Sequence, residues 1–215
     1  MSIRAVIFDL GGVLVRTEDP APRRELATRL GLTREQIYYH VFDSPSARQA
    51  TLGQISTDEH WEAIRLGMGL ALEDFPTVRQ AFWGGDRLDY DLVDYIRSLR
   101  PRYKTGLLSN AWGDLREMLT ERWKIADAFD VLVISAEVGI AKPDALIFSL
   151  ALERLGVSAE EAVFVDDFVE NIEAARAYGL HTVHFRMPDQ ARVELGRLLG
   201  DASAGTIFQP RMEGL

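Results

Sequence analysis

The 215-residue chain is 47% hydrophobic and 27% charged, as an ordinary globular protein is, which excludes a disordered chain, a collagen and a small disulfide scaffold. Its formal net charge is −9 and it has no basic run, so we expect no nucleic-acid partner, because such binders usually present a basic face. The absence of cysteine excludes disulfides, zinc–thiolate sites and a thiol nucleophile.

The first predicted element is a buried strand near the N-terminus. Residues 4–8, RAVIF, are rich in β-forming side chains and lead into Asp9 and the turn pair Gly11-Gly12. Asp9 interrupts the apolar run and no small-residue cleavage site follows, which argues against a secretion signal. No apolar run approaches the ~18 residues that a membrane span needs. We therefore expect a cytoplasmic protein without a membrane partner.

Residues 17–85 are predicted to form an all-helical segment. Stretches such as PRRELATRLG, REQIYYHVF and DEHWEAIRLGMG place apolar side chains at helical spacing, and prolines and glycines separate them. No convincing strand pattern occurs in this region.

Predicted strands and helices alternate from about residue 87 onward. YKTGLLS, VLVIS, AVFVD and HTVHF predict strands, and the segments between them predict helices. Short, nearly continuous apolar strands alternating with helices favour a parallel sheet that is covered on both faces. The expected fold is therefore an α/β, doubly wound, Rossmann-like core of residues 1–16 and 86–215, with the helical segment 17–85 inserted after the first strand.

Polar side chains stand at or just after the carboxyl ends of the predicted strands, which is where ligands of such sheets bind. Among them are carboxylates that can hold Mg²⁺ or act as a covalent nucleophile. A hydroxyl, an amide and an ammonium complete the set and suit a transferring phosphoryl group. These residues are Asp9, Ser109, Asn110, Lys142, Asp166 and Asp167.

Each of these residues also has an ordinary structural explanation. Asp9 can be a turn residue, and Asp167 can be a helix N-cap in a capping box with Glu170. Lys142-Pro143 can be the solvated start of a helix, and Ser109-Asn110 can cap one. Four such coincidences at successive strand ends are less plausible than one shared site, so the sequence favours phosphoryl-transfer chemistry.

The same residues resemble the haloacid dehalogenase-like hydrolase superfamily. FDLGGVLV at 8–15, LLSN at 107–110, GIAKPD at 139–144 and VFVDDFVENIEAA at 163–175 correspond to its four motifs in order. The resemblance implies a helical cap, Mg²⁺ as cofactor and a small phosphorylated metabolite as substrate. It implies that Asp9 is the nucleophile, Ser109 the phosphate-contacting hydroxyl, Lys142 the stabilising lysine and Asp167, with Asp166 beside it, the metal-binding acid. Asn171 falls where many relatives have a further acid, which implies a weaker or indirect metal contact.

The first motif departs from phosphatases of this type at Gly11, where they usually have an Asp that serves as general acid and base. Gly11 can still offer its backbone carbonyl to Mg²⁺, but it cannot protonate a leaving group, a contribution typically worth about 10²–10⁴ in rate. Three explanations stay open. The substrates can have good leaving groups, as sugar 1-phosphates, acyl phosphates and aryl phosphates do; Glu18, Asp19 or His40 can supply the proton; or the site can be degenerate. The sequence also resembles a branch with Gly here that includes phosphatases similar to α-glucose-1-phosphate phosphatase, which favours a working enzyme.

The helical segment is expected to supply substrate contacts. Arg48 is a candidate to grip a second anionic group. Trp61 and Trp83 are expected in the core of the cap. The candidates for substrate binding are Glu18, His40, Phe42, Ser44 and Arg48, together with Asn110 from the second motif.

The predicted function is thus a Mg²⁺-dependent phosphatase that works through an aspartyl-phosphate. One alternative is a non-catalytic or regulatory protein with a degenerate site. The other is a metal-independent haloacid dehalogenase, which the adjacent Asp166-Asp167 pair disfavours, because close carboxylates without a cation raise each other's pKa.

Overall fold

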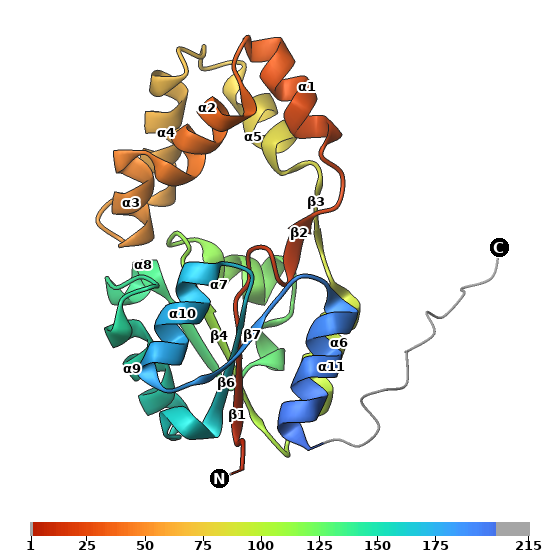
Figure 1. The fold of residues 1–215 in the computed structure, drawn as a ribbon. Helices are drawn as coiled ribbons and strands as arrows, with labels where there is room; N and C mark the ends of the chain where they lie inside the picture. The colour runs from red at the N-terminus through yellow and green to blue at the C-terminus, as the bar shows by residue number, and fades with distance from the viewer. Residues whose placement is uncertain (1, 201–215) are drawn as a thin grey trace, which may run out of the picture.

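The computed structural model describes residues 2–200 and contains an α/β core beneath a helical cap (Figure 1). A five-stranded parallel sheet in the order β5-β4-β1-β6-β7 forms the centre of the core, which confirms the predicted doubly wound parallel sheet. The strand order reverses beside β1, where ligands of such sheets bind. The strands are β1 (Ala5–Phe8), β4 (Lys104–Ser109), β5 (Val131–Ile134), β6 (Ala162–Asp166) and β7 (His181–His184).

Helices cover both faces of the sheet, because side chains along each strand alternate between the two faces. Val6 and Phe8 of β1 pack into one apolar layer with α6 (Tyr90–Leu99) and α11 (Pro188–Leu199). Ala5 and Ile7 pack into the opposite layer with α9 (Ala145–Leu155) and α10 (Val169–Tyr178). Figure 1 shows these two pairs of helices on opposite sides of the sheet. The strands are buried on both faces, which explains their continuous apolar sequences.

The register of the sheet aligns the carboxyl ends of its central strands. Phe8 pairs with Leu107 of β4 on one side and with Val165 of β6 on the other. The residues that follow these partners therefore meet at one edge. Figure 1 shows that this edge faces the cap.

The cap consists of helices between β2 and β3 and has its own apolar core. Leu26, Ile37, Trp61, Ile64 and Phe82 are buried together there. The helices are α1 (Ala21–Leu30), α2 (Arg34–Tyr38), the π-helical turn η1 (Tyr39–Asp43), α3 (Pro45–Thr51), α4 (Thr57–Gly67) and α5 (Phe75–Trp83).

A two-stranded antiparallel ribbon of β2 (Val15–Thr17) and β3 (Asp86–Leu88) joins the cap to the core. This ribbon cannot be predicted from the sequence, because three-residue strands show too little periodicity of apolar side chains. The two connections run so close together that a Cβ on Gly85 would lie 1.8 Å from the carbonyl oxygen of Asp19. Glycine is therefore required at this crossing.

Two helix predictions need correction. Pro143 does not start a helix: α9 begins at Ala145, and Asp144 is its N-cap, with a side chain that accepts a hydrogen bond from the Leu146 amide. The segment between β4 and β5 was expected to be a helix, as were the others between strands, but it forms only the short α7 (Leu115–Glu117) and the π-helical turn η2 (Met118–Arg122). Further short elements are α8 (Ser135–Val138) and the 3₁₀ turns η3 (Ala126–Ala128) and η4 (Ala159–Glu161). Between residues 2 and 200, no helix has the length and apolar character that a membrane span requires.

Candidate active site

Three carboxylates meet at the carboxyl edge of the sheet. Asp9 follows β1, Asp166 ends β6, Asp167 comes next, and one carboxylate oxygen of each lies within 4.8 Å of the others. The backbone amide of Asp9 still donates to the carbonyl of Val165, 2.9 Å away, so Asp9 is held against β6. Asp9 is 7% exposed and Asp166 is fully buried. Buried carboxylates at this spacing require a compensating cation.

Lys142 supplies one positive charge to this cluster. Its Nζ lies 2.7 Å from Asp9 Oδ1 and 2.7 Å from Asp166 Oδ2, and its side chain is almost completely buried. Asn110 holds the Lys142 backbone from both sides: the Asn110 amide donates to the Lys142 carbonyl and its Oδ1 accepts from the Lys142 amide, each at 2.8 Å. This geometry favours a positioning role for Asn110 over the substrate contact that the sequence suggested.

Burial dominates the electrostatics of the cluster. It raises the pKa of Asp9 to about 7, against the attraction of Lys142 and with a further contribution from Asp166. Burial and then the Asp166 charge also raise the pKa of Asp167. Burial alone would lower the pKa of Lys142, but Asp9 and Asp166 raise it, so the ammonium stays charged at neutral pH. One ammonium cannot neutralise three carboxylates, so a further cation would balance the remaining negative charge of the cluster.

Asp166 and Asp167 differ in how their oxygens are used. Asp166 accepts hydrogen bonds from the Phe168 amide at 2.7 Å and from the Asn171 side-chain amide at 3.1 and 3.2 Å, besides its contact with Lys142. Asp167 Oδ1, by contrast, is buried and has no hydrogen-bond partner among residues 2–200. An orphaned carboxylate oxygen beside other carboxylates fits a hard cation such as Mg²⁺. It also disfavours the N-cap explanation of Asp167, because the N-cap of α10 is Phe168.

Gly11 and Gly12 belong to the loop that follows Asp9, and this loop passes close to Asp167. Gly12 has a φ of +78°, and a Cβ there would lie 2.1 Å from Asp167 Oδ2. Gly11 differs, since nothing lies within 4 Å of the position that its Cβ would occupy. Only Gly12 is therefore required for the close approach of this loop to Asp167.

This contrast predicts unequal effects of two alanine substitutions. Gly12→Ala combines a left-handed backbone with a clash, and should lower the free energy of unfolding by about 1–3 kcal/mol. Gly11→Ala is the matched control: it restricts the unfolded chain to the same extent and should cost less than about 0.5 kcal/mol. Urea unfolding of both variants measures the difference, and equal stabilities would contradict it.

Ser109 reaches the same edge from the neighbouring strand. It is the last residue of β4, which pairs with β1 through Phe8 and Leu107, and it is 3% exposed. The structure thus brings the strand-end residues of β1, β4 and β6 together with Lys142.

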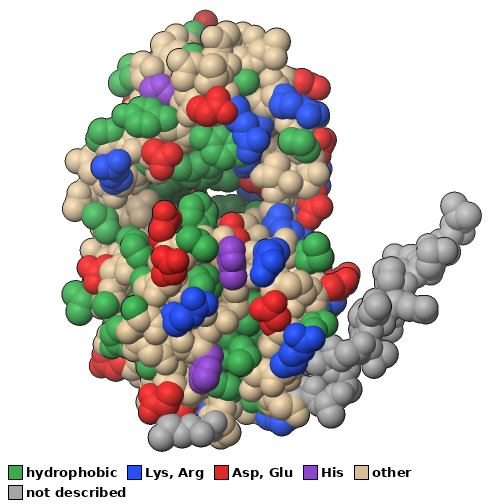
Figure 2. Space-filling model, in the orientation of Figure 1, with side chains coloured by type: hydrophobic (Ala, Val, Ile, Leu, Met, Phe, Trp, Pro, Cys, Tyr) green, Lys and Arg blue, Asp and Glu red, His purple; other side chains and the backbone are tan. Residues whose placement is uncertain are grey.

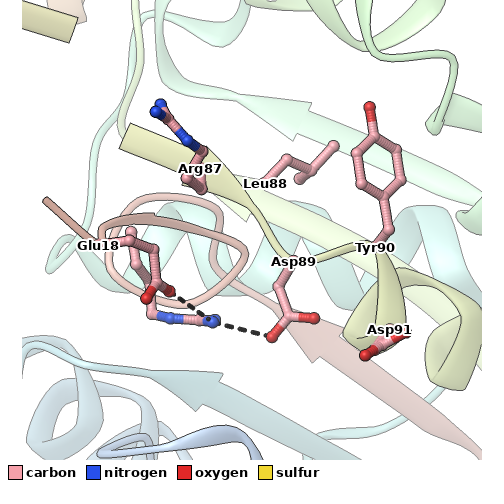
Figure 3. Close-up of a pocket in the computed structure, with 7 residues that line it drawn as sticks. Glu18, Arg87, Leu88, Asp89, Tyr90 and Asp91 are labelled. Atoms are coloured by element: carbon pink, nitrogen blue, oxygen red, sulfur yellow. Dashed lines mark hydrogen bonds and ion pairs between the residues drawn. The ribbon is translucent and has the colours of Figure 1, made fainter. Parts of the chain in front are cut away.

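Glu18 lies instead at the hinge between cap and core. Its carboxylate and that of Asp89 both pair with the Arg16 guanidinium, at 3.1 and 2.9 Å. Figure 3 shows Glu18 and Asp89, with dashed lines for these two contacts. They belong to a pocket of about 390 Å³ lined by Arg16, Glu18, Arg87, Leu88, Asp89, Tyr90 and Asp91. The pocket lining includes none of the clustered carboxylates, and the Glu18 carboxylate is paired with Arg16.

The other predicted cap residues have local partners. The His40 ring packs against Gly67 of α4, because a Cβ on Gly67 would lie 2.9 Å from it. Ser44 caps α3 by accepting from the Ala47 amide, and Asp19 accepts from the Ala21 amide at the start of α1. Arg48 is exposed on α3. These contacts lie within the cap and its connections to the core.

Two further residues near the site have structural roles that were not predicted from the sequence. His184 ends β7, and its Nε2 lies 3.0 Å from the Asp167 carbonyl oxygen, so it steadies the loop that carries Asp167. Its position at a strand end is the signal that could have identified it. Trp112 follows β4 and packs against the apolar core of the cap, which no local sequence pattern indicates.

The comparisons with known proteins agree with this geometry. The chain is similar to a sesquiterpene phosphatase of Aspergillus oryzae, with 29% identity over 93% of this chain and 98% of that protein. It is 30% identical to the D-ribitol-5-phosphate phosphatase of Bacteroides thetaiotaomicron, over 84% of this chain and 90% of that one. Some relatives are longer, and the chain spans 39% of the bifunctional epoxide hydrolase 2 of Sus scrofa.

A solved structure and a family model complete the comparison. A HAD family enzyme from Bacteroides thetaiotaomicron, in complex with magnesium and inorganic phosphate, has a TM-score of 0.71 and 25% identity, covering 86% of this chain and 95% of that one. The model of the haloacid dehalogenase-like hydrolases matches residues 3–179. With the four motifs gathered at one sheet edge, this match shows that the chain belongs to the haloacid dehalogenase-like hydrolase family.

Proposed function

We propose that the protein is a Mg²⁺-dependent phosphatase of small phosphorylated metabolites that forms an aspartyl-phosphate on Asp9. The observation that carries the proposal is the buried cluster in which Asp9 contacts Lys142, while one Asp167 oxygen has no hydrogen-bond partner in the described part of the chain. Phosphatases among the relatives support it, as does the similar enzyme that binds magnesium and inorganic phosphate. In this proposal residues 1–16 and 86–215 carry the chemistry and residues 17–85 form the cap; residues 201–215 lie outside the described range.

The residues of the cluster divide into those that would hold Mg²⁺ and those that support them. Asp9, Asp167 and the backbone carbonyl of Gly11 would hold the ion, whereas Asp166 is occupied by Lys142 and Asn171 and would contribute mainly charge. When bound, Mg²⁺ supplies positive charge to the phosphoryl oxygens.

The chain's own residues would perform two displacements at phosphorus. The Asp9 carboxylate attacks in line, the bond from phosphorus to the substrate oxygen breaks, and the leaving group departs with the electron pair. The Ser109 hydroxyl donates to a phosphoryl oxygen, and the Lys142 ammonium, held in place by Asn110, offsets the negative charge. Water then attacks the aspartyl-phosphate at phosphorus, which releases phosphate and restores Asp9.

The absence of a side chain at Gly11 favours substrates whose leaving groups need little protonation. Aryl phosphates, acyl phosphates and sugar 1-phosphates meet this condition. Gly11→Asp should raise kcat/KM for alkyl phosphates, by up to about 10²–10⁴, and much less for aryl phosphates. The space around the Gly11 Cβ position is open, so the carboxyl can be accommodated.

Gly11→Asn is the matched control for that prediction, because it has the same shape as Gly11→Asp without an acidic proton. Hydrolysis of ethyl phosphate and p-nitrophenyl phosphate by the two variants provides the measurement. Equal rates of Gly11→Asp and Gly11→Asn on ethyl phosphate would show that the leaving-group argument is wrong.

The affinity for Mg²⁺ should fall in acid. A carboxylate must be deprotonated to bind a metal, and the pKa of Asp9 in the metal-free protein is about 7. Below that value each Mg²⁺ bound displaces a proton, so affinity should fall by up to about tenfold per pH unit between pH 7 and 5. Isothermal titration with Mg²⁺ at several pH values tests this, and Asp9→Asn should reduce the slope. An affinity independent of pH over this range would contradict the assignment of Asp9 as a ligand.

A substrate screen separates the proposal from its alternatives. Hydrolysis of p-nitrophenyl phosphate or sugar 1-phosphates that requires Mg²⁺ and stops with EDTA is expected. Release of chloride from 2-haloacids without metal would instead identify a dehalogenase. Binding of Mg²⁺ without turnover of any phosphate ester would identify a non-catalytic relative.

A further inference from the structure

An aromatic wall connects the cap to the strand-end loop of the core. We use this term for Phe42, Trp83 and Trp112. The Phe42 ring centroid lies 6.0 Å from that of Trp83 and 6.5 Å from that of Trp112, and the two indoles are 6.3 Å apart. Phe42 comes from η1, Trp83 ends α5, and Trp112 belongs to the core. Residues far apart in the chain thus form one apolar surface.

Trp112 places this wall near the reacting end of the site. It lies three positions after Ser109, so the chain length limits how far it can stand from that hydroxyl. The loop between them is fixed, because the Ala111 amide donates to Ser135 Oγ at 3.0 Å and the Ala111 carbonyl accepts from that hydroxyl at 3.1 Å. On the cap side, Thr57 donates to Asp114 at 3.0 Å. The wall therefore begins beside the strand-end residues and continues into the cap.

The wall remains partly open to solvent. Phe42 is 42% exposed, although it contacts four aromatic rings, and Trp83 and Trp112 are half-buried. On the core side, Phe168 is 60% exposed and directly follows Asp167. Figure 2 shows the molecule hollowed between cap and core, with hydrophobic side chains along the cap side of the hollow. Partly exposed aromatic rings beside a hollow mark a surface that gains from an apolar occupant.

Arg23, a cation beside the wall, is already committed to other partners. Arg23 packs over the Phe82 ring at 4.3 Å, but it is buried, donates to the Phe82 carbonyl at 2.8 Å and pairs with Asp86 at 2.7 Å. It therefore braces the cap from behind the wall and does not offer its charge to a ligand.

We propose that the aromatic wall binds an apolar organic group, hydrocarbon or aryl, carried by the phosphate ester substrate. This inference rests on the proposed phosphatase function and deepens it by naming the substrate class. Phe42 and Trp83 from the cap and Trp112 from the core hold the group. The phosphoryl group is then left at Asp9, Ser109 and Lys142.

A series of para-alkylphenyl phosphates, from phenyl to butylphenyl, tests the wall. Their leaving groups have nearly equal acidity, so differences in kcat/KM report burial of the alkyl chain and not bond breaking. Each methylene that enters the site should raise kcat/KM about three- to fourfold. The matching phosphonates, which cannot be hydrolysed, measure the same dependence in binding through tryptophan fluorescence.

Variants of the wall should remove the dependence on chain length. In Phe42→Ala and Trp112→Leu, kcat/KM should no longer increase with the length of the alkyl chain, while phenyl phosphate is still hydrolysed. Trp112→Phe should retain part of this increase. Tyr39→Ala is the matched control: Tyr39 belongs to η1, as Phe42 does, and is 50% exposed, but its ring contacts His40 and not the wall. Circular dichroism checks that each variant is folded.

The outcomes separate this inference from the proposed function. A flat series in the wild-type protein, in both binding and turnover, would overturn the wall as a substrate site. Chain-length dependence that survives in Phe42→Ala and Trp112→Leu would overturn it as well. Phosphonate binding that follows chain length without turnover of any ester would support the wall and overturn the phosphatase assignment.

Discussion

Asp9→Asn is expected to lower the turnover of p-nitrophenyl phosphate by about 10⁴-fold or more, because an amide cannot replace a carboxylate as nucleophile. Asp9 is the carboxylate that contacts Lys142 from the end of β1, and its backbone is fixed against β6. Since the substitution conserves side-chain volume, the fold should be retained.

The matched control is Asp144→Asn, the same substitution near the site at the N-cap of α9. Asparagine caps helices about as well as aspartate, so this variant should keep its activity. Both variants need thermal unfolding curves beside the rates. Asp9→Asn turnover above about 1% of wild type, in a preparation free of contaminating phosphatase, would contradict a nucleophilic Asp9.

Lys142→Met is expected to abolish turnover and to lower the free energy of unfolding by about 3–5 kcal/mol. Its ammonium lies between Asp9 and Asp166 at 2.7 Å from each, and both carboxylates are buried. Removing the cation leaves these buried charges without compensation. The corresponding fall in Tm is about 6–20 °C for a chain of this size.

The pH dependence of this loss has a definite sign. In the folded wild-type protein the pKa of Asp9 is already raised to about 7 from 3.8, so the folded state binds more protons than the unfolded state between these values. Ionisation of Asp9 therefore costs stability as the pH rises, and loss of Lys142 enlarges that cost. The destabilisation should be smaller at pH 5 than at pH 8. The double variant Lys142→Met/Asp166→Asn should recover stability but not turnover, and equal losses at both pH values would contradict this account.

The parallel sheet could be predicted because its strands are buried on both faces. RAVIF, YKTGLLS, VLVIS, AVFVD and HTVHF are apolar for that reason, and β1, β4, β5, β6 and β7 lie within or along them. The strand-end rule then brought Asp9, Ser109 and Asp167 to one edge without any contact information. These predictions were possible because the topology of a parallel sheet places the carboxyl ends of its strands at one edge.

The details that depend on tertiary contacts could not be predicted. The Asn110 side chain hydrogen-bonds to the backbone of Lys142, 32 residues away, and Glu18 pairs with Arg16 at the hinge. Neither partner follows from local sequence. The glycine pair illustrates the same limit: the sequence indicated a turn, and only the position of Asp167 shows why Gly12 has to be glycine.

The most direct test is to identify the residue that becomes phosphorylated. Because Gly11 provides no base for the attacking water, the phosphoenzyme should accumulate, and a rapid acid quench during turnover of an aryl phosphate should capture it. The account predicts one phosphoryl group on the peptide that contains Asp9, and none in Asp9→Asn. A phosphoryl group on another side chain, or product release with no phosphoenzyme at any quench time, would contradict it.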